Sequence, residues 1–481
     1  MAFSLPTIVK AQKYDWQKTN ASVVSTGDLV WHPEFFQFET GKIIRYIDYE
    51  NGNDQNAGNS KDAPWKHHPW DSQAGGNAAT SGGIDTYVFK GGVAYRGNLI
   101  AKESGTPDNP IRLTMDPSWG KGEAMIYGSE AITGGWQRVD VNAAPGFPQP
   151  EKVWYIDLGK GQTPRLVWER RSHMIHRLQI ARYPNWQVSN PDDIKSKWLE
   201  WDRSETKEME EGKSNSSRII AYDNQLPKAE KDAYQGATVW TEYVGVMGTP
   251  YAVPVEDYNP ENNSLRFEHV YGSGGRPPIG GSRYFLENLP HFLDSPGEFY
   301  FAEDGPGAGR LYLRLPDDRD PNETTIEVAR RIKMIDVQDK SNIEISGLTF
   351  RFQNVFDVHA RDFVHEDVTA AGVRAFGNVE NFNVKNCIFE HVAKGVHCQA
   401  EGDNKFMDNI VISDNVITNF EHAALAVRDG SSWGKKGEDI GVLRRARILR
   451  NKIYNGGFRP IRSESAHTLT VTNGELVEVS G

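Results

Sequence analysis

Apolar and polar residues alternate along several short stretches in the last third of the chain. In the stretch 394–402, KGVHCQAEG, small or apolar residues stand at 396, 398 and 400, and polar residues stand between them. A hydrophobic period of two is typical of a half-buried β-strand. The stretch therefore predicts a strand whose outward face carries His397, Gln399 and Glu401.

Further stretches share this register, so the pattern is a repeat. The segments are ISGLTFRFQNVFDVHARD (345–362), VKNCIFEHVAKGVHCQAE (384–401), ISDNVITNFEHAALAVRD (412–429) and ILRNKIYNGGFRPIRSE (448–464). Each begins with an apolar residue, has another at its sixth position, turns through a polar or glycine-containing corner and alternates again. Asparagine at the predicted corners tolerates left-handed backbone and can hydrogen-bond along a stack; these corners are Asn386, Asn415 and Asn451. The repeat predicts the coils of a parallel β-helix.

Aligning the second strand of each segment predicts which side chains share a column. The inward column consists of Val358, Cys398, Val427 and Ser463. Two outward columns flank it, one with Asp357, His397, Ala426 and Arg462, the other with His359, Gln399, Arg428 and Glu464. Glu401 and Asp429 lie just beyond, and neighbouring coils stack about 4.8 Å apart. The alignment predicts one exposed patch of ionisable side chains.

This patch contains the residue types used for acid–base chemistry on sugars. The alternative interpretation is that these side chains only form solvated ion pairs on the surface. Asp429 follows Arg428, and Glu464 follows Arg462, on the outward face. A neighbouring guanidinium lowers the pKa of a carboxyl group, so we expect Asp429 or Glu464 to be the nucleophile or base. Glu401 has no arginine in its own strand and is the candidate acid.

Other side chains are predicted to contact the substrate. They are His359, His397, Arg428, Arg462 and Trp433. Trp433 stands in a long excursion between coils, 429–445, where an indole ring would offer a platform for stacking on a sugar.

Composition agrees with a β-rich protein and excludes some partners. The 481 residues suffice for two or three domains or one elongated repeat, and 46 Gly, 13 Trp and 18 Tyr favour strands and turns. The net charge of −11 argues against nucleic acid and against an anionic membrane surface. No apolar run is long enough to span a membrane. Both cysteines, Cys387 and Cys398, fall at inward positions, and no zinc spacing is present, so we expect no metal or cofactor.

The N-terminal third resembles the first coils of secreted right-handed β-helix proteins of the pectate-lyase-like superfamily. The matching residues are Asn53-Asp54, Gly58, Pro64-Trp65-Lys66, Asp85-Thr86-Tyr87, Gly91-Gly92 before Tyr95, and Gly105 to Ile111.

The middle of the chain resembles the β-sandwich insertion of glycoside hydrolase family 141. The matches are Ala181 to Pro184 before the insertion and Leu293 to Tyr300 after it, with Phe299 where that family has tryptophan. An α-helix is predicted at 191–203. The resemblance implies architecture more strongly than chemistry, because this fold carries lyases, hydrolases, epimerases and binding proteins.

The predicted fold is all-β: a right-handed parallel β-helix, or solenoid, with an inserted β-sandwich-like unit. The expected parts are an N-terminal arm and cap (1–45), first coils (46–149), a mainly antiparallel insertion (150–315) and C-terminal coils with the site (316–481). After Glu464 the sequence predicts one more strand. An end there would leave an open sheet edge, which raises the alternative of a truncated product.

Three functions remain open. The favoured one is a secreted or periplasmic bacterial glycosidase that cleaves a plant or algal polysaccharide or oligosaccharide, as a monomer and with a carboxylate pair. The first alternative is a polysaccharide lyase acting on a uronic-acid glycan, with Ca²⁺ as its cation. The second is a non-catalytic glycan-binding β-helix, which would need aromatic residues on the outward columns.

Overall fold

The computed structural model describes most of the chain. The described residues are 21–23, 25–26, 29–31, 33–140, 146–159, 161–171, 174–186, 195–208, 217–243, 250–269, 277–355, 369–402, 404–430, 441–456, 467–472 and 475–480. Strands make up nearly all of the regular structure in these residues. The helical segments are one short α-helix, α1 (Gly76–Thr80), and the 3-10 turns Pro150–Lys152, Pro290–Phe292, Pro316–Asp318 and Pro321–Glu323.

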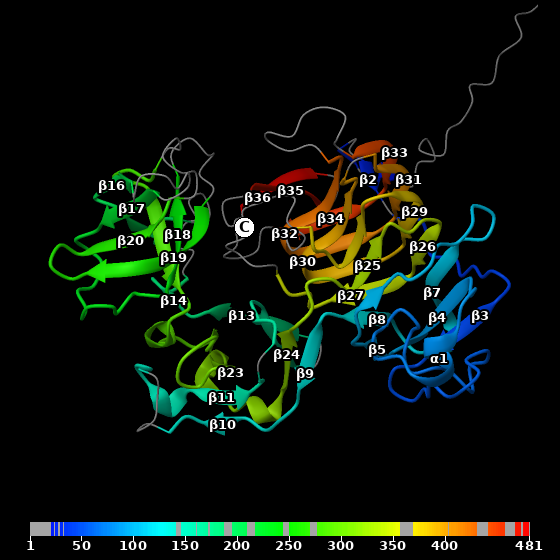
Figure 1. Cartoon of the computed structure of the whole chain (residues 1–481), viewed down its shortest axis with the longest axis horizontal. Helices are drawn as coiled ribbons and strands as arrows, with labels where there is room; N and C mark the ends of the chain where they lie inside the picture. The colour runs from blue at the N-terminus through cyan, green and yellow to red at the C-terminus, as the bar shows by residue number, and fades with distance from the viewer. Residues whose placement is uncertain are drawn as a thin grey trace, which may run out of the picture.

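Two large sheets are parallel and stack along the right side of the view in Figure 1. The first has the order β3 (Ile44–Ile47), β4 (Thr86–Gly91), β7 (Ile111–Gly120), β26 (Ile343–Ser346), β29 (Val379–Lys385), β31 (Phe406–Ser413) and β33 (Val442–Leu449). The second has the order β5 (Ala94–Tyr95), β8 (Ala124–Tyr127), β27 (Leu348–Arg351), β30 (Ile388–Gln399), β28 (Val373–Phe376), β25 (Ile335–Gln338) and β6 (Leu99–Ile100). Two more strands belong to this second sheet: β32 (Val416–Arg428) pairs with β30, and β34 (Lys452–Gly456) pairs with β32.

The predicted repeat register is confirmed in both parallel sheets. The first residues of the segments pair in sequence, as Ile345 with Val384, Val384 with Ile412 and Ile412 with Ile448. The sixth residues do the same, as Phe350 with Phe389, Phe389 with Ile417 and Ile417 with Ile453. The rings of Phe350 and Phe389 stack with centroids 4.7 Å apart. Residues of both parallel sheets share one buried hydrophobic cluster, so the strand interiors face a common core.

Asparagine ladders link neighbouring parallel strands. Of the three predicted corner asparagines, two are bonded side chain to side chain: Asn415 Nδ2 donates to Asn451 Oδ1 at 2.9 Å, whereas Asn386 Nδ2 donates to the Glu34 carbonyl. A second ladder was not predicted, in which Asn381 Nδ2 donates to Asn342 Oδ1 at 2.8 Å and Asn409 Nδ2 donates to Asn381 Oδ1 at 2.7 Å. The three residues of this second ladder have φ between 51° and 58°, and asparagine tolerates that left-handed backbone.

One part of the predicted alignment is wrong. The strand that pairs with the Cys398 segment from the preceding turn is β28, with Ala375 opposite Cys398 and Arg374 opposite His397. Val358, which was predicted for that place, lies outside the described residues. The alignment failed because a long excursion separates β27 from β28, and the pattern was continued directly through it.

Two further sheets are mainly antiparallel and lie at the left and bottom of Figure 1. One has the order β10 (Gln137–Arg138), β11 (Trp154–Asp157), β23 (Arg310–Arg314), β22 (Glu298–Phe301), β13 (Met174–Ile180), β12 (Val167–Arg171), β24 (Thr325–Ala329) and β9 (Ser129–Ile132). The other has the order β14 (Arg182–Tyr183), β21 (Arg283–Glu287), β18 (Thr238–Glu242), β19 (Pro250–Asn259), β20 (Ser264–Glu268), β17 (Ser217–Tyr222) and β16 (Arg203–Glu208), with β15 (Leu199–Glu200) beside β21. Strands β9, β10 and β24 lie outside the range 150–315 that was expected for the insertion.

The helix predicted at 191–203 is wrong for its described part, 195–203. A turn is followed by β15 and the start of β16, and Leu199 pairs with Tyr284. Trp201 stacks on Tyr284 with ring centroids 3.5 Å apart, and its Nε1 donates to Thr241 Oγ1 at 2.8 Å. These tertiary contacts outweigh the local helical pattern, because helix propensity is worth under about 1 kcal/mol per residue.

The end of the chain also differs from the prediction of one strand. It forms two paired antiparallel strands, β35 (His467–Thr472) and β36 (Glu475–Ser480). The intervening sequence is Asn-Gly, a strong hairpin signal that the prediction overlooked. Near the other end, β1 (Ala21–Val23) and β2 (Leu29–Trp31) form a second antiparallel pair.

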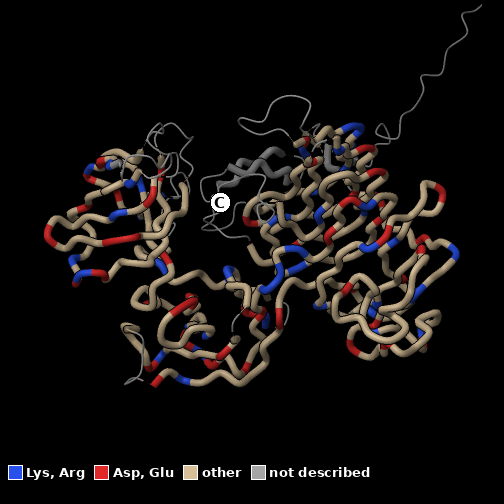
Figure 2. Tube along the Cα trace, viewed as in Figure 1, with Lys and Arg blue, Asp and Glu red and all other residues tan. Residues whose placement is uncertain are grey.

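Acidic and basic positions are interspersed along the chain (Figure 2). In the part of the chain that the structure describes, no helix is both long and apolar enough to cross a membrane.

Candidate functional site

The structure describes four of the eight predicted site residues, and it brings them to the ends of two adjacent strands. His397 lies in β30, Arg428 ends β32, and Glu401 and Asp429 follow these strands. The other four, His359, Trp433, Arg462 and Glu464, lie outside the described residues.

The pairing of β30 with β32 has the predicted register. Cys398 stands opposite Val427, and Gln399 stands opposite Arg428. The Ala400 amide donates to the Arg428 carbonyl at 3.2 Å, so Asp429 follows at the level of Ala400, next to Glu401. Since paired strands are about 4.8 Å apart, the backbones of Glu401 and Asp429 are neighbours.

A chain of polar side chains runs along the outward face of β30 and ends on Glu401. Lys394 Nζ lies 3.2 Å from His397 Nδ1, and His397 Nε2 lies 2.9 Å from Gln399 Oε1. Gln399 Nε2 donates to Glu401 Oε2 at 2.9 Å. The amide oxygen of Gln399 only accepts, so His397 Nε2 carries the hydrogen and Nδ1 accepts from Lys394.

Burial determines the protonation states of Lys394 and His397 in this row of polar side chains. Lys394 is 3 % exposed and His397 is 2 % exposed. Burial, together with the Lys394 charge, lowers the pKa of His397 well below its usual value. Burial, together with the Arg428 charge, lowers the pKa of Lys394 to about 8. At neutral pH a neutral imidazole therefore lies between a cationic lysine and the glutamine that donates to Glu401.

The polar face extends to an earlier turn that the alignment missed. Arg374 of β28 is fully buried and makes a bidentate pair with Asp336 of β25, with Nε–Oδ1 at 2.7 Å and Nη2–Oδ2 at 3.0 Å. Arg374 stands opposite His397 across the strand pair. The short apolar–polar alternation in VRAF, residues 373–376, was the signal that could have located it.

One of the mainly antiparallel sheets contacts β32, the strand that leads to Asp429. Arg177 of β13 and Glu421 of β32 form a buried ion pair with Nη1–Oε1 at 2.7 Å. Trp168 of β12 also lies near β30, with its ring 6.3 Å from that of His391. These contacts place β12 and β13 beside the strands that end at Glu401 and Asp429.

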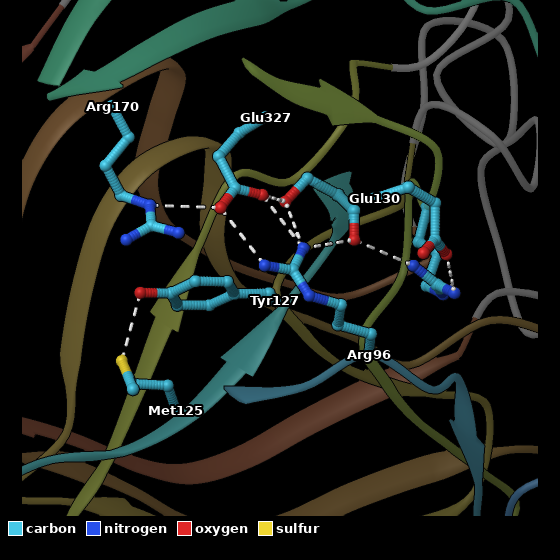
Figure 3. A network of polar contacts seen from close by, with 8 residues as sticks. Arg96, Met125, Tyr127, Glu130, Arg170 and Glu327 are labelled. Atoms are coloured by element: carbon cyan, nitrogen blue, oxygen red, sulfur yellow. Dashed lines mark hydrogen bonds and ion pairs between the residues drawn. The ribbon is translucent and has the colours of Figure 1, made fainter. Parts of the chain in front are cut away.

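A second polar cluster joins the antiparallel sheet to the first turns, as Figure 3 shows. Glu327 accepts hydrogen bonds from Arg96 Nη1 at 2.8 Å, Arg96 Nη2 at 3.0 Å, Ser129 Oγ at 2.6 Å and Arg170 Nε at 3.2 Å. Burial would raise its pKa, but these donors lower it overall. Glu327 is fully buried and saturated with donors, so it is a structural carboxylate rather than a candidate acid or base.

Among the described residues, no group of three or more His, Cys, Asp and Glu side chains is placed to hold a metal ion.

The chain is similar in fold to a solved glycoside hydrolase. The structure titled "Glycoside hydrolase" aligns with a TM-score of 0.52 and 14% sequence identity over 86% of this chain and 84% of that chain. A second structure, "The complex structure of XylC with xylose", aligns with a TM-score of 0.34 and 12% identity over 86% of this chain and 62% of that chain. No family model and no curated protein sequence matches the chain. At these identities the likeness concerns the fold, which does not by itself specify chemistry.

Proposed function

We propose that the stacked parallel strands form a right-handed β-helix of the pectate-lyase-like type and that the protein is a glycoside hydrolase acting on a plant or algal glycan. The observation that supports this most directly is the buried polar chain that ends on Glu401, next to Asp429 in the following turn. The fold likeness to a solved glycoside hydrolase supports the same class.

In this proposal Glu401 is the acid that protonates the glycosidic oxygen. The Gln399 side-chain amide donates to Glu401 Oε2 and so holds the carboxyl group in position. Gln399 is itself held by His397, and His397 by Lys394. Asp429 or Glu464 is the nucleophile or base, as the sequence predicts.

We assign His397 a role that differs from the substrate contact expected from the sequence. Both ring nitrogens lie within hydrogen-bonding distance of Lys394 and Gln399, and the side chain is buried. We therefore assign it a positioning role for Glu401 instead of direct contact with sugar hydroxyls.

The test is a set of separate variants, Glu401→Gln, Asp429→Asn and Glu464→Gln, assayed on a polysaccharide panel for new reducing ends. Loss of an acid or base costs about 100-fold or more in turnover. Glu401→Gln should recover activity on aryl glycosides, whose leaving group needs no protonation. Asp408→Asn is the matched control, because Asp408 pairs with Arg445 on the other parallel sheet. Wild-type turnover in all three folded variants would refute the site.

One observation favours a polysaccharide lyase as the second candidate. The pKa of Lys394 is lowered to about 8, mainly by burial, which brings the amine toward the range of a general base. A lyase would give an ultraviolet-absorbing unsaturated product and would lose activity with a Ca²⁺ chelator. A hydrolase gives new reducing ends without that absorbance. A glycan-binding protein would retain the polysaccharide without turnover.

A further inference from the structure

A cavity of about 210 Å³ lies between β13 and the turn that leads into β22. Gln179 of β13 pairs in parallel with Glu298 of β22, and the backbone N–H of Gln179 donates to the Gly297 carbonyl at 2.9 Å. Paired residues of adjacent strands extend to the same side of a sheet. The backbone therefore places both Gln179 and Glu298 on one wall of this cavity, which Asn185 and Trp186 also line.

Two acceptors at this cavity have no hydrogen-bond partner among the described residues. They are Gln179 Oε1 and Asn185 Oδ1, and both atoms are buried. The Asn185 side chain is fixed, because its Nδ2 donates to Asp294 Oδ1 at 2.9 Å. Buried polar atoms in proteins are nearly always satisfied by protein or by an ordered molecule. A molecule in this cavity would satisfy both acceptors if it offers hydrogen-bond donors such as hydroxyl groups.

Glu298 supplies the complementary donor. It is 4 % exposed. Burial, reinforced by the negative charge of Asp294, raises its pKa to about 9 against the opposing effects of a hydrogen bond from the Ser295 backbone amide and of the Arg182 and Arg314 charges. The carboxyl group therefore keeps its proton at neutral pH and can donate. Arg177 also lines the cavity, and its charge is paired with Glu421. Thus, the described wall offers two acceptors and the Glu298 donor, and Arg177 adds a buried Nε atom that has no hydrogen-bond partner among the described residues.

We propose that this cavity binds a single uncharged sugar ring, with Trp186 as the stacking surface and Gln179, Asn185 and Glu298 as partners for its hydroxyls. This inference rests on the proposed function, because a glycan is the substrate class there. Sugar faces stack on indole rings, and the polar edge of a ring meets hydrogen-bonding side chains. The volume exceeds what one water needs but is below the roughly 300 Å³ at which pockets for drug-sized ligands begin. A single sugar ring fits this size.

Binding is tested by calorimetric titration of the intact protein at pH 7 with glucose, galactose and xylose, and with glucuronate as the charged counterpart. We expect at least one neutral sugar to bind with a millimolar Kd, and glucuronate to bind more weakly than glucose. Trp186→Ala and Gln179→Leu should each weaken binding at least 10-fold, and Trp186→Phe should retain part of it. The matched control is Gln137→Leu, an exposed glutamine on β10 of the same sheet, which should change nothing.

Three results would overturn the proposal. They are no neutral sugar binding at high millimolar concentration, glucuronate binding more tightly than glucose, and unchanged affinity in both cavity variants with wild-type circular dichroism. The titration is repeated with Asp429→Asn to separate the two proposals. Asp429→Asn should lose turnover and still bind sugars in the cavity. Wild-type protein that cleaves no glycan of the panel but binds sugars in the cavity refutes only the hydrolase. An active hydrolase whose cavity variants bind normally refutes only this site.

Discussion

Replacing Glu327 with glutamine should strongly destabilise the junction between the antiparallel sheet and the first parallel turns. The substitution keeps the side-chain volume but removes the charge that Arg96 and Arg170 contact. Arg96 is 14 % exposed and would keep a largely buried charge without its counter-ion. Breaking one partner of a buried ion pair costs about 3–5 kcal/mol. Arg170 is 40 % exposed, so its share should be under about 1 kcal/mol.

The assay is urea unfolding followed both by far-ultraviolet circular dichroism and by tryptophan fluorescence. The two transitions must coincide before one free energy is assigned to a chain of this size. A double-mutant cycle with Arg96→Gln should show a coupling energy between about 0.5 and 3 kcal/mol, with the double variant less destabilised than the sum. Additive effects, or a Glu327→Gln cost within about 0.5 kcal/mol, would refute the reasoning.

The pH dependence of the same variant has a definite sign. The donors around Glu327 lower its pKa in the folded protein. Its contribution is therefore present above the pKa of an unfolded glutamate, about 4.3, and is lost as the pH falls through the lower folded value. The stability difference between the wild type and Glu327→Gln should shrink below about pH 4. A constant difference down to the acid transition would contradict this assignment.

Three further outcomes are expected. Asn381→Ala interrupts the unpredicted asparagine ladder and should cost about 1–3 kcal/mol in urea unfolding, and a cost near zero would show that the ladder is incidental. Burial raises the pKa of Glu298 to about 9, so the folded state holds a proton that the unfolded chain releases near pH 4.3. Wild-type stability should therefore fall relative to Glu298→Gln as the pH rises from about 5 to 9, and parallel thermal-melting curves would contradict this. Lys394→Met removes a charge that lowers the pKa of His397, so the His397 imidazole should titrate at higher pH by NMR. The pKa should stay below the ordinary value, because burial remains the main cause of the shift. An unchanged or lower pKa would exclude the Lys394 charge as a cause.

The stacking of the turns could be read from the sequence because it depends on local periodicity. Apolar residues at the first and sixth positions, such as Ile345 and Phe350, must face a common core, and the structure pairs them with the equivalents in the next turn. Side chains alternate between the two faces of a strand, so a shift by one residue would expose the whole apolar set. The same alternation placed Cys398 opposite Val427 and Gln399 opposite Arg428.

The sequence could not locate features that depend on residues distant along the chain. The partner of the His397 strand is β28, because an excursion of unpredictable length separates it from β27. The segment 195–203 is not helical, because the partners of Trp201, which are Tyr284 and Thr241, belong to later strands.

The chemistry of the site divides in the same way. The sequence by itself determined that His397, Gln399 and Glu401 point to the same side of β30 and of the residues that follow it, since this follows from a period of two. Only the tertiary structure decided that His397 is buried and hydrogen-bonded to Lys394 and Gln399, and that Glu298 faces a cavity with Gln179. The physical reason is that burial and charge pairing depend on which strands pack together, and these set the protonation of a side chain.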